Sequence, residues 1–117
     1  MKSYTDLEQS KKLAEILPLE SADMCYGIDD DTLKYNNLPW LIPYNKYTAK
    51  EYYIPCWSLA ALLKLIPIID ENSYQLVGTL DGGAICKHPC TCIMYQEKEP
   101  IDAVFNMIVW LKESKYI

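Results

Sequence analysis

IPCWSLAALLKLIP, residues 54–67, is bracketed by prolines, filled by Trp57 and a run of Leu and Ala, and charged only at Lys64. An apolar run between two prolines predicts one short buried helix, which we expect to begin near Cys56 to Ser58. The stretch contains no catalytic, metal-binding or phosphate-binding pattern. It therefore predicts a compact core and leaves the chemistry of the protein open.

The segments before this helix predict one more helix and one strand. Residues 5–17 form the first helical pattern, with Thr5 and Glu8 as a capping box and Pro18 as the stop signal. A short strand is expected around residues 24–28.

The segments after the central helix predict a β-hairpin over residues 73–96. Residues 73–80 form its first strand, Asp81-Gly82-Gly83 the turn, and residues 84–96 the returning strand. Pro89 lies inside the returning strand, which is therefore expected to be an edge strand or to bend there.

A last helix is expected from Pro100 to about Ser114, because proline is favoured at the first helical position. Apolar residues recur in it at helical spacing: Ile101, Val104, Phe105, Ile108 and Leu111. The element order predicts a single α+β domain over residues 1–117, with about three helices packed on a small, mostly antiparallel sheet.

Composition narrows the classes of function. The net charge is −5, and the chain has eleven lysines and no arginine, which argues against nucleic acid as a partner. No apolar run reaches the ~18 residues of a transmembrane helix, so no membrane contact is expected.

The first residues show no secretory signal, which favours a cytoplasmic location. Five cysteines in such a setting are expected to be free thiols rather than a disulfide framework.

Four potential zinc ligands fall within seven residues: Cys86, His88, Cys90 and Cys92. Alternate residues of a strand lie ~6.6 Å apart, whereas sulfurs around one zinc ion lie ~3.7 Å apart. A regular strand therefore cannot present all four ligands to one ion, and the usual C-x₂-C spacing is missing. We expect free thiols on a sheet face, with a zinc site as the alternative.

Catalysis by the same segment is not expected. His88 is the only histidine of the chain, and a neighbour two residues along a strand is poorly placed to take a proton from a cysteine. Neither a catalytic residue nor a cofactor is assigned from the sequence.

An aromatic segment gives the strongest candidate for an interface. Its members are Trp40, Tyr44, Tyr47, Tyr52 and Tyr53. Tyrosine and tryptophan are enriched at protein interfaces, where one end of the side chain is apolar and the other is wet. The alternative is that these side chains cover the core.

Three segments resemble a known group of proteins: LAEILPLESADMC at 13–25, IPCWSLAALLKLIP at 54–67 and PIDAVFNMIVWLK at 100–112. The resemblance is to short uncharacterised proteins encoded by gut Bacteroidales genomes and their phages and prophages. It implies a bacterial or phage origin and a cytoplasmic setting, and it implies no chemistry.

Three hypotheses follow for the function. The first is a non-enzymatic protein-interaction or accessory module of phage or prophage origin, which contacts another protein or a second copy of itself. The second is a small structural zinc-binding protein that uses the segment from Cys86 to Cys92. The third is an enzyme or small-ligand binder with an aromatic-lined cleft.

Overall fold

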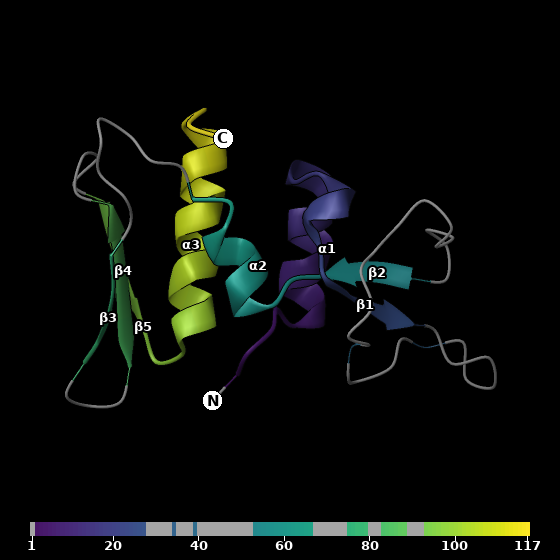
Figure 1. Cartoon of the computed structure of the whole chain (residues 1–117), viewed down its shortest axis with the longest axis horizontal. Coiled ribbons are helices and arrows are strands. Elements are labelled where there is room, and N and C mark those ends of the chain that lie inside the picture. Colours follow the sequence, from purple (N-terminus) through teal and green to yellow (C-terminus); the bar gives the residue numbers. More distant parts are fainter. Residues whose placement is uncertain are drawn as a thin grey trace. The chain divides into compact units, whose positions relative to one another are not determined.

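The computed structural model describes residues 2–27, 34, 39, 53–66, 75–79, 83–88 and 93–117. Within these residues the chain has three α-helices, one short 3₁₀ helix and two antiparallel sheets, of two and three strands (Figure 1). The predicted α+β class is confirmed, although the strands belong to two sheets instead of one. The chain divides into two compact units, residues 4–61 and residues 1–3 with 62–117. That residues 1–117 form one domain stays a prediction.

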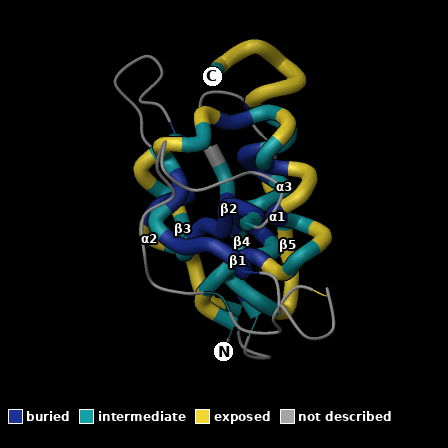
Figure 2. The backbone as a smooth tube through the Cα atoms, turned by 90° about the vertical axis from the view of Figure 1, so that its right-hand side faces the viewer, coloured by how far each residue is buried: buried dark blue, intermediate teal, exposed yellow. Residues whose placement is uncertain are grey.

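Residues 4–61 form a two-stranded sheet with a helix packed on it. In chain order the elements are α1 (Leu7–Ile16), the 3₁₀ helix η1 (Leu19–Ser21), β1 (Met24–Gly27), β2 (Tyr53–Cys56) and the start of α2 (Leu59–Leu63). The two strands pair antiparallel, with Met24 opposite Cys56 and Gly27 opposite Tyr53. All four residues of β1 are buried, as the dark blue tube of Figure 2 shows. The strand predicted around residues 24–28 is thereby confirmed.

Helix α1 confirms the first predicted helix but corrects its cap. The capping box is formed by Asp6 and Gln9: the Gln9 amide donates to Asp6 Oδ1 at 2.8 Å, and the Asp6 amide donates to Gln9 Oε1 at 3.1 Å. The predicted pair of Thr5 and Glu8 is wrong by one residue, because the Thr5 side chain is buried and bonded elsewhere. The helix ends before Pro18, as predicted.

The stretch 54–67 is not one helix. Helix α2 begins at Leu59, next to the predicted start near Cys56 to Ser58, whereas Ile54 to Cys56 belong to β2, a strand that was not predicted. A residue before proline avoids the helical region, which places Ile54 in extended backbone. The helix starts where Ser58 Oγ accepts a hydrogen bond from the Ala61 amide at 3.1 Å, as a serine N-cap does.

Residues 62–117 contain a three-stranded antiparallel sheet and one long helix. The elements are β3 (Gln75–Gly78), β4 (Ala84–His88), β5 (Ile93–Glu97) and α3 (Pro100–Glu113). The strand order is β3-β4-β5, so the predicted hairpin is a meander of three strands. The single returning strand predicted for 84–96 is wrong: β4 ends just before Pro89, and His88 pairs with Ile93. Because proline has no N–H to donate to a neighbouring strand, Pro89 favours the end of β4 at His88.

Alternation along the strands gives the three-stranded sheet two different faces. Ala84 and Cys86 are buried on the face that α3 covers, where the Asn106 amide also donates to Glu97 Oε1 at 3.0 Å. The other face carries Val77 and Met94, which are 48% and 59% exposed. Helix α3 packs on β4 and β5. The sheet is thus covered by a described helix on one face.

Helix α3 confirms the predicted final helix within one residue at its C-terminal end. Its buried side chains are Ile101, Ala103, Val104, Met107, Ile108 and Leu111. Phe105, which the periodicity places on the apolar face, is only half-buried. Lys2 binds the first turn of the helix: its amide donates to Glu99 Oε2 at 2.9 Å and its ammonium pairs with Asp102 Oδ1 at 2.8 Å. No helix in the described ranges is both long and apolar enough to cross a membrane.

The C-terminal end of α3 is a Schellman motif with an unusual residue. The Tyr116 amide donates to the Leu111 carbonyl at 2.8 Å, and the Lys115 amide donates to the Lys112 carbonyl at 3.1 Å. Lys115 has φ = 65°, the left-handed conformation that favours glycine. The motif turns the chain back so that the Tyr116 ring stacks on Trp110, with ring centroids 5.6 Å apart.

We predict that Lys115→Gly raises the free energy of unfolding by about 1 kcal/mol, because glycine adopts φ > 0 without the clash of a Cβ. Urea unfolding followed by circular dichroism measures the change. The matched control is Lys112→Gly inside the last helical turn, which should lower stability by about 0.5–1 kcal/mol. Equal losses in both variants would show that the left-handed conformation is not maintained.

Candidate functional site

A network of buried hydroxyl and thiol groups joins the segment before α1 to β2. Thr5 and Ser10 are fully buried, and their hydroxyl oxygens lie 2.8 Å apart. Thr5 Oγ1 also accepts from the Trp57 amide at 3.2 Å and lies 3.5 Å from Cys56 Sγ. The Thr5 amide donates to the Trp57 carbonyl at 2.9 Å. Every polar atom of Thr5 is therefore used within the fold, counting its carbonyl, to which the Tyr26 hydroxyl donates at 2.8 Å.

Burial keeps the acidic groups of this network protonated. Burial raises the pKa of the Cys56 thiol, and hydrogen bonds to Thr5, Ser10 and Tyr26 offset part of that rise. The pKa of the Tyr26 hydroxyl is also raised, first by burial and then by the nearby Cys56. The thiolate is the reactive form of cysteine, so a buried thiol that keeps its proton is a poor nucleophile. The network holds the segment before α1 against the end of β2.

A second set of hydrogen bonds fixes the turn from β2 into α2. The Asp23 carboxylate accepts from the Ser58 amide at 2.9 Å and from the Ser58 hydroxyl. The Trp57 indole N–H donates to Ser21 Oγ at 2.9 Å, while the indole itself is fully buried. The turn is thereby held to Ser21 at Trp57 and to Asp23 at Ser58.

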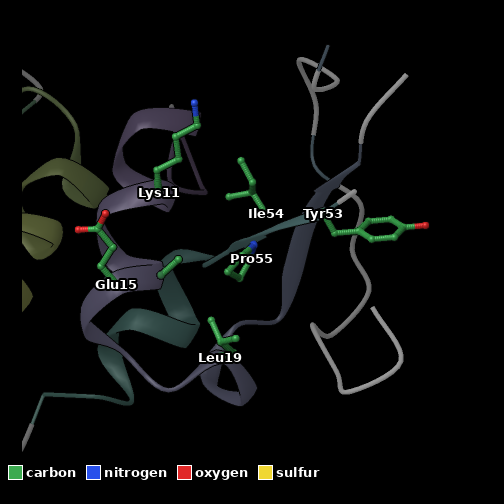
Figure 3. A pocket seen from close by; sticks show the side chains of 7 residues that line it. Lys11, Glu15, Leu19, Tyr53, Ile54 and Pro55 are labelled. Carbon is green, nitrogen blue, oxygen red and sulfur yellow. The ribbon is translucent and has the colours of Figure 1, made fainter. Parts of the chain in front are cut away.

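An open groove of about 360 Å³ lies between α1 and β2 (Figure 3). The described residues that line it are Lys11, Ala14, Glu15, Leu19, Tyr53, Ile54 and Pro55. Its volume is near the lower end of the range for ligand pockets, which is roughly 300 to 1,000 Å³. The groove is therefore large enough for a few side chains and is not a deep cofactor cavity.

The periodicity of α1 forms one side of this groove. Lys11, Ala14 and Glu15 follow the i, i+3, i+4 spacing that places side chains on one helical face. Ala14 contributes a small side chain to this face, next to Glu15 in the sequence. On the other side, Figure 3 shows Ile54 and Pro55 near the helix, with the Tyr53 ring pointing away from it. We take the groove, with its apolar floor and charged rim, as the candidate functional site.

The predicted zinc ligands are only partly described. Cys86 is fully buried, and burial raises the pKa of its thiol to about 11. His88 ends β4 and only its backbone is described, while Cys90 and Cys92 lie outside the described residues. Among the described side chains, no group of three or more potential ligands comes together. A zinc site stays an untested alternative.

The predicted aromatic interface also falls mainly outside the described residues, because Trp40, Tyr44, Tyr47 and Tyr52 lie there. Tyr53 is described: it opens β2, is half-buried and lines the groove. Sequence reasoning did not identify the remaining groove residues. The i, i+3, i+4 spacing on α1 was an available signal, but no strand was predicted for Ile54 and Pro55, so the opposite side was missed.

No family model, no curated protein and no solved structure matches this chain. The resemblance to short proteins of Bacteroidales and their phages stays a prediction.

We predict that Thr5→Val lowers the free energy of unfolding by about 1–3 kcal/mol, because the variant leaves the buried Trp57 amide and Ser10 hydroxyl without their partner. Urea unfolding gives the value. Thr5→Ser is the control: it keeps the hydroxyl and loses one methyl group, which costs about 1 kcal/mol. A valine variant as stable as the wild type would argue against the network.

We predict that the buried Cys86 thiol makes stability depend on alkaline pH. An unfolded thiol ionises near pH 9.0, whereas the folded one ionises only near pH 11. The stabilisation is therefore complete below pH 9 and is lost as the pH rises towards 11. Urea midpoints across this range should fall less steeply in Cys86→Ala than in the wild type. Parallel pH profiles would contradict the assignment.

Proposed function

We propose that this chain is a non-enzymatic protein-interaction module that binds an extended peptide segment of a partner protein in the groove between α1 and β2. The proposal includes a cytoplasmic setting and a bacterial or phage origin. The observation that carries it is the combination of an apolar floor with two opposite charges on the rim.

The floor favours apolar side chains. Leu19, Ile54 and Pro55 line the groove, and Ile54 also belongs to the core cluster beneath it. Ile54 and Pro55 are already buried, so a bound segment would gain mainly by removing its own apolar side chains from water, at ~25 cal/mol for each Å² buried. Pro55 has a second effect. Because it has no backbone N–H, it cannot donate a hydrogen bond to a further strand laid beside β2.

The rim favours an extended segment with two charges. Lys11 and Glu15 are exposed and lie one helical turn apart, a rise of about 6 Å. Residues i and i+2 of an extended chain lie about 6.6–6.8 Å apart and point to the same side. An acidic and a basic residue two positions apart can therefore pair with both rim charges at once, which sets orientation and specificity.

The chemistry nearest the groove supports binding over catalysis. Cys56 follows the floor residues directly in β2, but it is fully buried and its raised pKa keeps it protonated. A nucleophile needs a base within reach and access to the substrate. Neither condition is met by Cys56 in the described structure, whereas peptide recognition needs only the surface that is present.

We predict that Ala14→Trp weakens peptide binding by filling the groove. Peptides selected from a displayed library on the wild-type protein should carry an acidic and a basic residue two positions apart. Fluorescence anisotropy with these peptides should give a dissociation constant at least about tenfold higher for Ala14→Trp. Ala60→Trp is the matched control, because it adds the same side chain at an exposed helical position outside the groove.

Reversing one of the two rim charges gives a second test of the proposal. Glu15→Lys makes both rim charges positive, so selection on this variant should shift to peptides with two acidic residues. Peptides that bind the Ala14→Trp protein as tightly as the wild type would overturn the proposal. So would a selection on the wild-type protein that yields no binding peptide.

A further inference from the structure

The backbone of β2 points alternately towards β1 and away from it, as in any antiparallel ladder. Pro55 has no N–H, so its pair with Cys25 is a position at which the two strands exchange no hydrogen bonds. The Pro55 carbonyl therefore points away from β1. Trp57, two residues later, points the same way: its amide donates to Thr5 Oγ1 at 3.2 Å, and its carbonyl accepts from the Thr5 amide at 2.9 Å.

The segment before α1 occupies this outer side at one end of β2. Tyr4 forms an antiparallel bridge with Ser58, and Thr5 bonds the backbone beside it. Continued along the strand, this pairing would reach Pro55, but α1 turns the chain away from the edge after its cap, Asp6. The groove is lined by the part of β2 that this segment leaves unpaired, with α1 on the other side (Figure 3).

The Pro55 carbonyl accepts no hydrogen bond from the described part of the chain. Pro55 is nevertheless a buried residue, and it lines the groove. A buried backbone carbonyl without a partner costs free energy, which is why most such groups in folded proteins are paired. An occupant of the groove that directs an N–H at this carbonyl would satisfy an acceptor that the described residues leave open.

We propose that the partner segment adds to the outer edge of β2 as a third strand and donates one backbone N–H to the Pro55 carbonyl. This inference rests on the proposed function and names the way in which the peptide is recognised. Residues 4 and 5 already pair with the same edge, which favours an extended occupant. A strand also has the two-residue spacing that the rim charges Lys11 and Glu15 select. The peptide residue opposite Pro55 must keep its N–H, so proline is excluded there.

The test is an amide-to-ester scan of a peptide selected on the wild-type protein. Each backbone N–H is replaced in turn by an ester oxygen, which removes the donor and keeps every side chain. Fluorescence anisotropy should find one ester that raises the dissociation constant by about fivefold or more. The esters one position before and after it are the matched controls. They should bind like the unmodified peptide, because the N–H groups of the flanking residues point away from β2.

Hydrogen exchange of the bound peptide gives an independent measurement. The amide that the ester scan identifies should exchange more slowly in the complex than the two amides beside it. A peptide that binds the wild type, binds Ala14→Trp more weakly and tolerates an ester at every position would overturn strand addition, while the groove would remain a peptide site. If no peptide binds the wild type, the proposed function itself fails, and this inference fails with it.

Discussion

Thr5 is the residue on which the structure of residues 4–61 depends most. Its side chain is fully buried and bridges Ser10 of α1 to Cys56 and Trp57 at the end of β2. Buried polar groups cost free energy unless they are paired, so such a network is stabilising only when every member has a partner. Thr5 supplies those partners with its hydroxyl, amide and carbonyl groups. It thereby fixes the start of α1 against β2, which are the two sides of the groove.

The three-stranded sheet depends on a different constraint, the alternation of side chains along β4. Ala84 and Cys86 are small and fully or nearly buried, which lets α3 approach the middle and one edge of the sheet. The buried face of α3 packs on two of the three strands, β4 and β5. The third, β3, is left with little cover, and its exposure follows from the packing rather than from its own sequence.

The sequence predicts the long elements well and the short ones poorly. Helix α3 has a proline at its first position and four turns of regular periodicity, so its limits follow from local rules. The run 54–67 is shorter and apolar throughout, and periodicity does not separate a buried strand from a buried helix in such a run. Its division at Ser58 depends on pairing with β1 and on Asp23, which lie some thirty residues earlier.

The candidate site was harder to predict for the same reason. Its two sides come from α1 and from residues 53–55, about forty positions apart, and no local pattern connects them. Tyr53 alone was identified, through its aromatic neighbours in the sequence. The capping box shows the effect on a smaller scale: Thr5 fits the local rule for a cap, but tertiary contacts use its side chain and leave the cap to Asp6.

The placement of the described thiols is one of the observations behind the proposed recognition function. Cys25, Cys56 and Cys86 are buried, and burial raises the pKa of each thiol. The groove instead presents opposite charges one helical turn apart beside apolar side chains, together with the Pro55 carbonyl at the edge of β2. Such a surface distinguishes the shape, charge order and backbone of a partner without transferring a proton or forming a covalent bond.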